Sequence, residues 1–163
     1  MMKKAIILAV SVSAMLSACH TSGNVDNFTI DIDAVSSATT AVEVPFVVAK
    51  GYFVRNDVKK LPNGKISKQK EFDAAFGEAA VMGADGRPTD IDFKEQYVIA
   101  VAKPVTDHLT ELEPVSLKGD GNGGLEFVYR TKVGERISYS MQPSLVVVVD
   151  NKYRGMVSIR EDK

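Results

Sequence analysis

The 163-residue sequence contains one cysteine, two histidines and no tryptophan. The single cysteine, Cys19, excludes a disulfide within the chain and a metal site built from several thiolates. Neither a GxSxG nucleophile motif nor a GxxxxGK[S/T] phosphate loop is present. We therefore expect a protein without catalytic residues, bound metal or cofactor.

Neither sign of charge dominates the sequence. It has 20 Lys and Arg residues against 21 Asp and Glu residues, for a formal net charge of −1. The basic residues form no long run, as a surface that tracks nucleic-acid phosphates would require. We therefore expect no nucleic-acid partner.

Only the N-terminus has a long apolar run, residues 5–16, which follows two lysines. A helix of this length spans roughly 18 Å, less than the ~30 Å hydrocarbon core, so the run is typical of a signal peptide. The next residues, Leu16-Ser17-Ala18-Cys19, resemble a bacterial lipobox. The resemblance implies a signal peptide at residues 1–18, cleavage before Cys19 and acylation of its thiol. The alternative is an ordinary secretory signal followed by a free thiol.

The residues after Cys19 predict the location. His20 stands where lipoproteins retained at the inner membrane of Gram-negative bacteria carry Asp, so the resemblance implies lipid anchoring at the outer membrane, on either face. Two or more acyl chains hold a protein stably on a bilayer. Residues 19–44 are rich in Ser, Thr, Asn, Asp and Ala and are interpreted as a tether. Within this tether, residues 28–32 alternate like a short edge strand.

From residue 45 to residue 163 the pattern is that of a single β-rich domain. Apolar runs at 96–103 and 144–150 predict buried central strands. Pro114 predicts that the strand containing it is an edge strand or carries a bulge. Further strands are predicted at residues 44–56 with a bulge at Gly51, and at 109–118, 125–133, 136–141 and 156–160.

Turn and helix signals divide these strands. Asn63-Gly64, Gly134-Glu135 and the glycine-rich residues 119–124 predict turns. One helix is predicted, with Ser67 as N-cap and Gly77 as its stop. The fold class is α+β and mostly β, with an antiparallel sandwich or a partly open barrel and one helix.

His108 is the one histidine inside the predicted domain. Beside Asp107 it has the pattern of a general base or metal ligand oriented by a carboxylate. The simpler interpretation is a solvated histidine in a turn.

Asp120 and Asn122 alternate like the first ligands of a calcium loop. Gly124 and Thr131, however, stand where further oxygen ligands are needed, so a plain turn is favoured. We expect residues 105–109 and 119–124 to share one loop end, where Asp107, His108, Asp120 and Asn122 contact a protein partner.

One family resemblance covers residues 66–160. Residues 91–101, IDFKEQYVIAV, and residues 142–149, QPSLVVVV, resemble the C-terminal domain of bacterial accessory lipoproteins that stabilise a surface protease complex. The resemblance implies a helix, several strands, a final apolar hairpin and a protein partner. The chain differs from that family at residues 104–109, where the family has a Gly-Gly-Tyr-like loop.

These features predict a lipid-anchored, non-catalytic module that binds or scaffolds a protein partner at the cell envelope. Two alternatives remain open. A small-ligand-binding β-barrel would contain a large internal apolar cavity. A hydrolase using His108 would gather it with other polar groups in a deep cleft.

Overall fold

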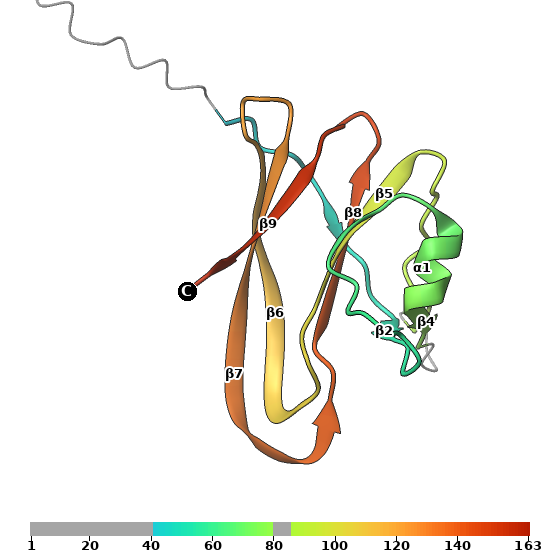
Figure 1. The fold of residues 1–163 in the computed structure, drawn as a ribbon, viewed down its shortest axis with the longest axis vertical. Coiled ribbons are helices and arrows are strands. Elements are labelled where there is room, and N and C mark those ends of the chain that lie inside the picture. The colour runs from blue at the N-terminus through green and yellow to red at the C-terminus, as the bar shows by residue number, and fades with distance from the viewer. Residues whose placement is uncertain (1–40, 80–85) are drawn as a thin grey trace, which may run out of the picture. The chain divides into compact units, whose positions relative to one another are not determined.

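The computed structural model describes residues 41–79 and 86–163, so Cys19, His20 and the strand expected at residues 28–32 lie outside the described residues. The described residues form one helix and nine strands in three sheets, which confirms a mostly β fold with one helix (Figure 1). In chain order the elements are β1 (Val47–Val48), β2 (Tyr52–Val54), β3 (Gly64–Ile66), α1 (Gln69–Ala75), β4 (Phe76–Glu78), β5 (Gln96–Ala102), β6 (Thr106–Gly119), β7 (Leu125–Met141), β8 (Ser144–Asp150) and β9 (Val157–Asp162).

The central sheet has the strand order β1-β8-β5-β3, and all its pairs are antiparallel. Strands β5 and β8 lie in the middle and are buried along nearly their whole length. Both faces of this sheet are covered, so successive side chains enter two different cores. This confirms the buried central strands predicted from the two apolar runs.

The two cores lie on opposite faces of the central sheet. On one face Tyr97, Ile99 and Val147 pack with Leu117 and Phe127 of the second sheet. Helix α1 and the two-stranded sheet β2-β4 pack against the other face. Its buried side chains are Val54, Phe72, Phe76, Ile91, Val98, Ala100, Ala102, Val146 and Val148.

The second sheet has the order β6-β7-β9, with β6 at an edge. The register of β6 against β7 shifts between Pro114 and Ser116, so the predicted edge position and bulge are both confirmed. Strand β9 runs parallel to β7 and does not pair with β8, which precedes it in the chain. The final hairpin that the family resemblance implied is therefore not formed. The sheets do not close into a barrel among the described residues.

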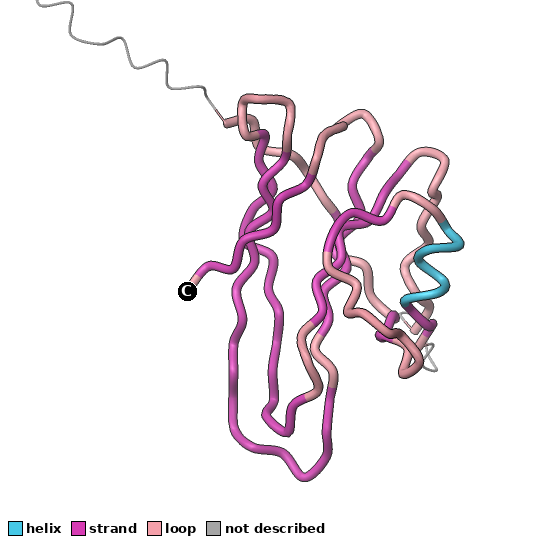
Figure 2. The backbone as a smooth tube through the Cα atoms, in the orientation of Figure 1, coloured by secondary structure: helices cyan, strands magenta, loops and turns pink. Residues whose placement is uncertain are grey.

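Glycine explains two of the predictions that were wrong. The single strand expected at residues 44–56 is divided into β1 and β2, because Gly51 adopts φ 77° and turns the chain from one sheet to another. Conversely, the turn expected at Gly134-Glu135 does not interrupt the strand, because β7 continues through both residues (Figure 2). A Cβ on Gly134 would lie 3.2 Å from the Leu109 carbonyl oxygen, so this glycine permits close strand contact.

The predicted helix boundaries were also wrong. Lys68, not Ser67, occupies the N-cap, and no side chain caps the helix there. Gly77 belongs to strand β4, where the Phe53 ring lies 2.6 Å from the position a Cβ would take. Gly77 therefore does not end the helix. Because it has no side chain, it leaves room for the Phe53 ring.

The turn predicted at Asn63-Gly64 was wrong as well, since Gly64 begins β3. The Asn63 side-chain oxygen accepts the Ala102 amide hydrogen at 2.7 Å, which joins this segment to the end of β5. Asn63, which was expected to form a local turn, therefore contacts a distant strand instead.

Residues just before position 45 belong to the folded unit. Val44 is 3% exposed, its amide donates to the Leu117 carbonyl at 2.8 Å, and Glu43 forms a bridge to Lys118. Composition placed these residues in the tether. The structure places them along the outer edge of β6, where apolar burial and backbone pairing hold them.

Candidate functional site

The chain crosses between its two larger sheets at one end of the domain (Figure 1). We call this the crossover end and define it as residues 103–111 and 131–143. Here β5 leads into β6 and β7 leads into β8. The register jumps from Thr106 opposite Met141 to His108 opposite Arg136, which leaves extra residues on β7. Side chains at this end are therefore less completely covered than those between the sheets.

Asp107 lies at the centre of a polar cluster on the crossover end. Its carboxylate accepts a hydrogen bond from Arg136 Nε at 2.7 Å, and His108 Nδ1 lies 3.0 Å from its other oxygen. The Arg136 hydrogen bond is the main cause that lowers the pKa of Asp107. In the described part of the chain, no three His, Cys, Asp or Glu side chains gather as metal ligands. The cluster is an exposed ion pair with an adjacent histidine.

Large apolar side chains are exposed at the same end of the domain. Val105, Leu109, Val133 and Tyr139 are between 50% and 65% exposed, and all four belong to the crossover end. Leu109, Val133 and Tyr139 fall in three different predicted strands and Val105 in none, so the sequence did not group the four. Exposed apolar residues that share a surface with charged residues are typical of a protein interface.

Three surface hollows adjoin the same end. The largest, about 520 Å³, lies beside Leu109, Leu112 and Met141 and reaches the β1 residue Val48. Hollows of about 380 Å³ and 450 Å³ lie beside Val105 and Val133 respectively. A partner's side chains therefore have recesses to enter here, as anchor residues at interfaces do.

Sequence reasoning missed a second polar cluster beside the third hollow. Lys103 Nζ donates to Glu161 Oε2 at 2.6 Å, and Thr131 donates to the other carboxylate oxygen. The Lys103 hydrogen bond, followed by that from Thr131, lowers the pKa of Glu161, and the same contact raises the pKa of Lys103. Lys103 and Glu161 lie 58 residues apart, so no local motif signals the pair. The cluster ties the end of β5 to β9.

The other two predicted site residues lie elsewhere. Asp120 and Asn122 occupy the loop between β6 and β7, at the opposite end of β6 from Asp107. The 14-residue strand separates the two places by roughly 45 Å. The prediction that residues 105–109 and 119–124 form a single contact surface is therefore wrong. Residues 105–109 lie at the start of β6, and residues 119–124 lie at its end.

Asp120 has a structural task in its loop. Its Oδ1 accepts the amide hydrogens of Asn122 and Gly124, both at 2.8 Å, while Gly121 and Gly123 adopt φ values of 79° and 85°. These contacts form the tight turn that the glycine-rich sequence predicted.

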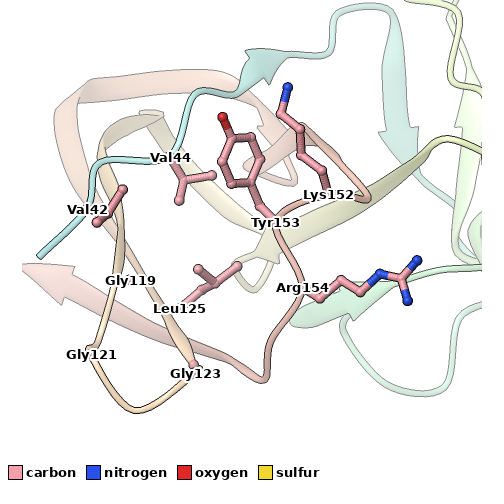
Figure 3. Close-up of a pocket in the computed structure, with 10 residues that line it drawn as sticks. Val42, Val44, Gly119, Gly121, Gly123, Leu125, Lys152, Tyr153 and Arg154 are labelled. Carbon is pink, nitrogen blue, oxygen red and sulfur yellow. The ribbon is translucent and has the colours of Figure 1, made fainter. Parts of the chain in front are cut away.

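This second end of the domain, which we call the loop end, consists of residues 42–44, 119–125 and 150–156. A hollow of about 380 Å³ lies between its three segments (Figure 3). Val42, Val44 and Leu125 line it, together with the stretch Lys152–Arg154 from the loop between β8 and β9. The loop end therefore combines an apolar recess with two cationic side chains.

Within residues 41–79 and 86–163, the structure has no helix long and apolar enough to cross a bilayer. Comparison with protein-family models, with curated proteins and with solved structures found no match for this chain.

Proposed function

We propose that the chain is a lipid-anchored, non-catalytic module that holds a protein partner through its crossover end. The exposure of Val105, Leu109, Val133 and Tyr139 at the end that also holds the Asp107–Arg136 pair carries the proposal. Leaving such side chains in water has a free-energy cost of about 25 cal/mol for each Å² that a partner would cover. A protein surface of complementary shape recovers that free energy.

The polar rim supplies specificity. Asp107, Arg136 and His108 belong to the same end and are partly exposed, so a partner's charges would meet them in solvent. Exposed pairs of this kind add little affinity but disfavour wrongly charged partners. The interface would thus combine apolar contact area with selectivity for charge.

The anchor in this proposal is Cys19, acylated after cleavage of residues 1–18, with the domain at the outer membrane. The lipobox-like Leu16-Ser17-Ala18-Cys19 supports it. Changing Cys19→Ala should leave the protein unprocessed or release it from the membrane fraction. A correctly cleaved variant that still partitions with membranes would disprove the anchor.

Site-specific photocrosslinking in the native envelope tests the partner. A photoreactive residue at Val133 or Tyr139 should capture the same protein repeatedly, whereas one at Val115, which is 44% exposed in the middle of β6, should not. Asp107→Arg should reduce the capture several-fold because it places like charge beside Arg136. Equal capture from all three positions would refute the assignment, as would hydrolysis of a substrate lost specifically in His108→Ala.

A further inference from the structure

The outer edge of β6 is paired over only part of its length. Near its end, the Val44 amide donates to the Leu117 carbonyl and the Gly119 amide donates to the Val42 carbonyl, both at 2.8 Å. The chain then leaves β6 and enters β1 of the central sheet. Among residues 41–79 and 86–163, no strand pairs with this edge along residues 107–114. The unpaired stretch begins at the crossover end, where the proposed partner binds.

Backbone groups of this stretch face away from β7. The Leu109 carbonyl oxygen lies 3.2 Å from the position that a Cβ on Gly134 of β7 would take, so it faces β7. By the alternation of a strand, His108 and Thr110 face the open edge. Their amides donate to side chains, namely to a threonine hydroxyl at 3.2 Å and to Met141 Sδ at 3.5 Å. Because a thioether sulfur is a weak acceptor, the carbonyl of an added strand would be a better partner.

Pro114 marks the end of this open edge. It has no amide hydrogen, and the register of β6 shifts between Pro114 and Ser116. Leu117 and Gly119, which pair with residues 42–44, lie beyond the shift. An added strand would therefore cover residues 107–113 and stop before Val115.

The largest hollow of the crossover end runs beside the same stretch. Residues 109–112 of β6 line it together with residues 141–146 and the β1 residue Val48, and its volume is about 520 Å³. An extended segment paired with β6 would direct alternate side chains into this hollow. Met141 has a flexible side chain that can move aside for them. The hollow thus offers apolar contact next to unpaired backbone.

The charge in the hollow favours a basic occupant. Of the described residues that line it, Glu111 is the only charged one. The other acids of the open stretch, Asp107 and Glu113, form ion pairs with Arg136 and Lys132 of β7. Lys132 also lies across from Glu111 in the register, but its Nζ bonds to Glu113. A Lys or Arg of the occupant would supply Glu111 with a counter-charge.

We propose that the protein partner binds as an extended strand added to β6 along residues 107–113. Its backbone would pair with His108 and Thr110, its apolar side chains would enter the hollow, and a Lys or Arg would meet Glu111. A second copy of β6 fits less well, because it would bring another Glu111 to the same edge. This inference rests on the proposed function and states how the partner is held.

Fluorescence anisotropy with the full chain purified in detergent tests the backbone contacts. The probe is a labelled synthetic peptide, Thr-Val-Lys-Val-Thr-Val, which alternates polar and apolar side chains and carries one cation. Two isomers carry N-methyl groups on either the odd or the even amides, so each loses the donors of one edge and keeps every side chain. We expect one isomer to bind about tenfold more weakly than the other, because only one edge of the peptide pairs with β6.

A charge exchange tests the side-chain contact. Glu111→Lys should weaken binding of the unmethylated peptide several-fold, and replacing the peptide's Lys by Glu should restore it. The matched control is Glu126→Lys, since Glu126 pairs with Arg160 away from the hollow and should leave binding unchanged.

Three results would overturn the strand addition: no saturable peptide binding, equal binding of the two methylated isomers, or a dimer in sedimentation that the peptide dissociates. The last would show that a second copy occupies the edge. Photocrosslinks from Val133 and Tyr139 that persist in any of these cases would leave the proposed function standing. Selective peptide binding without such crosslinks would support the strand edge and count against the proposed envelope partner.

Discussion

At the scale of single residues, the polar side chains divide into those that hold the fold and those left at its surface. Among the residues described, every buried side-chain nitrogen or oxygen has a hydrogen-bond partner. Tyr97 is fully buried, and its hydroxyl donates to the Tyr153 carbonyl at 3.0 Å. Burial raises the pKa of Tyr97 to about 12. Asp107 and His108, in contrast, remain partly open to solvent.

The Lys103–Glu161 pair predicts a pH-dependent contribution to stability. The folded state lowers the pKa of Glu161, so its contribution is present above the ordinary value of 4.5 and is lost as the pH falls through the folded value. Glu161→Gln should therefore lower the free energy of unfolding by about 1 kcal/mol at neutral pH. The difference from the wild type should shrink in acid.

Denaturant unfolding from pH 7 to pH 3 measures this difference. Glu126→Gln is the matched control, since Glu126 pairs with Arg160 at a more exposed place and should have almost no effect. A Glu161→Gln deficit that stays constant or grows below pH 4.5 would contradict the assignment of the pair.

At the scale of elements, glycine positions decide where strands bend and where they touch. Gly51 divides β1 from β2, whereas Gly77 and Gly134 lie inside strands next to a ring and a backbone carbonyl. Glycine therefore interrupts a strand at one position and allows close packing inside a strand at two others. Only the neighbours brought in by folding distinguish them.

Gly51→Ala tests this division. The variant would place a Cβ 2.8 Å from the Pro88 Cα and would hold an alanine at φ 77°. We expect a loss of about 2 kcal/mol in the free energy of unfolding, measured by chemical denaturation. Gly119→Ala is the control, because its Cβ would meet nothing closer than the Val42 carbonyl at 3.8 Å. Equal losses in the two variants would show that the backbone conformation at Gly51 is not what matters.

At the scale of the whole domain, β6 and β7 connect two ends with different chemistry. The crossover end exposes apolar residues beside the Asp107–Arg136 pair, and the loop end joins an apolar recess to Lys152 and Arg154. The strand segment at residues 42–44 pairs with β6 beside the second of these ends. The beginning of the described chain therefore contributes to the stability of the loop end.

Removing that segment should weaken the domain. A fragment of residues 45–163 lacks the buried Val44 side chain and the two backbone bonds that residues 42 and 44 form with Gly119 and Leu117. Compared with residues 41–163, we expect it to lose about 3 kcal/mol of unfolding free energy while keeping a β-type circular dichroism spectrum. Identical thermal and denaturant midpoints would show that the fold does not depend on the segment.

The sequence by itself determined the features that a short window of residues encodes. The unbroken apolar runs of β5 and β8 required burial on both faces, Pro114 required an edge strand or a bulge, and the glycines of residues 119–124 required a tight turn. Only the tertiary structure decided which glycines lie at close contacts, that β9 runs parallel to β7, and that Asp107 and Asp120 lie at opposite ends of β6. It also brought Lys103 to Glu161. These depend on contacts between residues far apart in the chain, and such contacts leave no periodic pattern in the sequence around either partner.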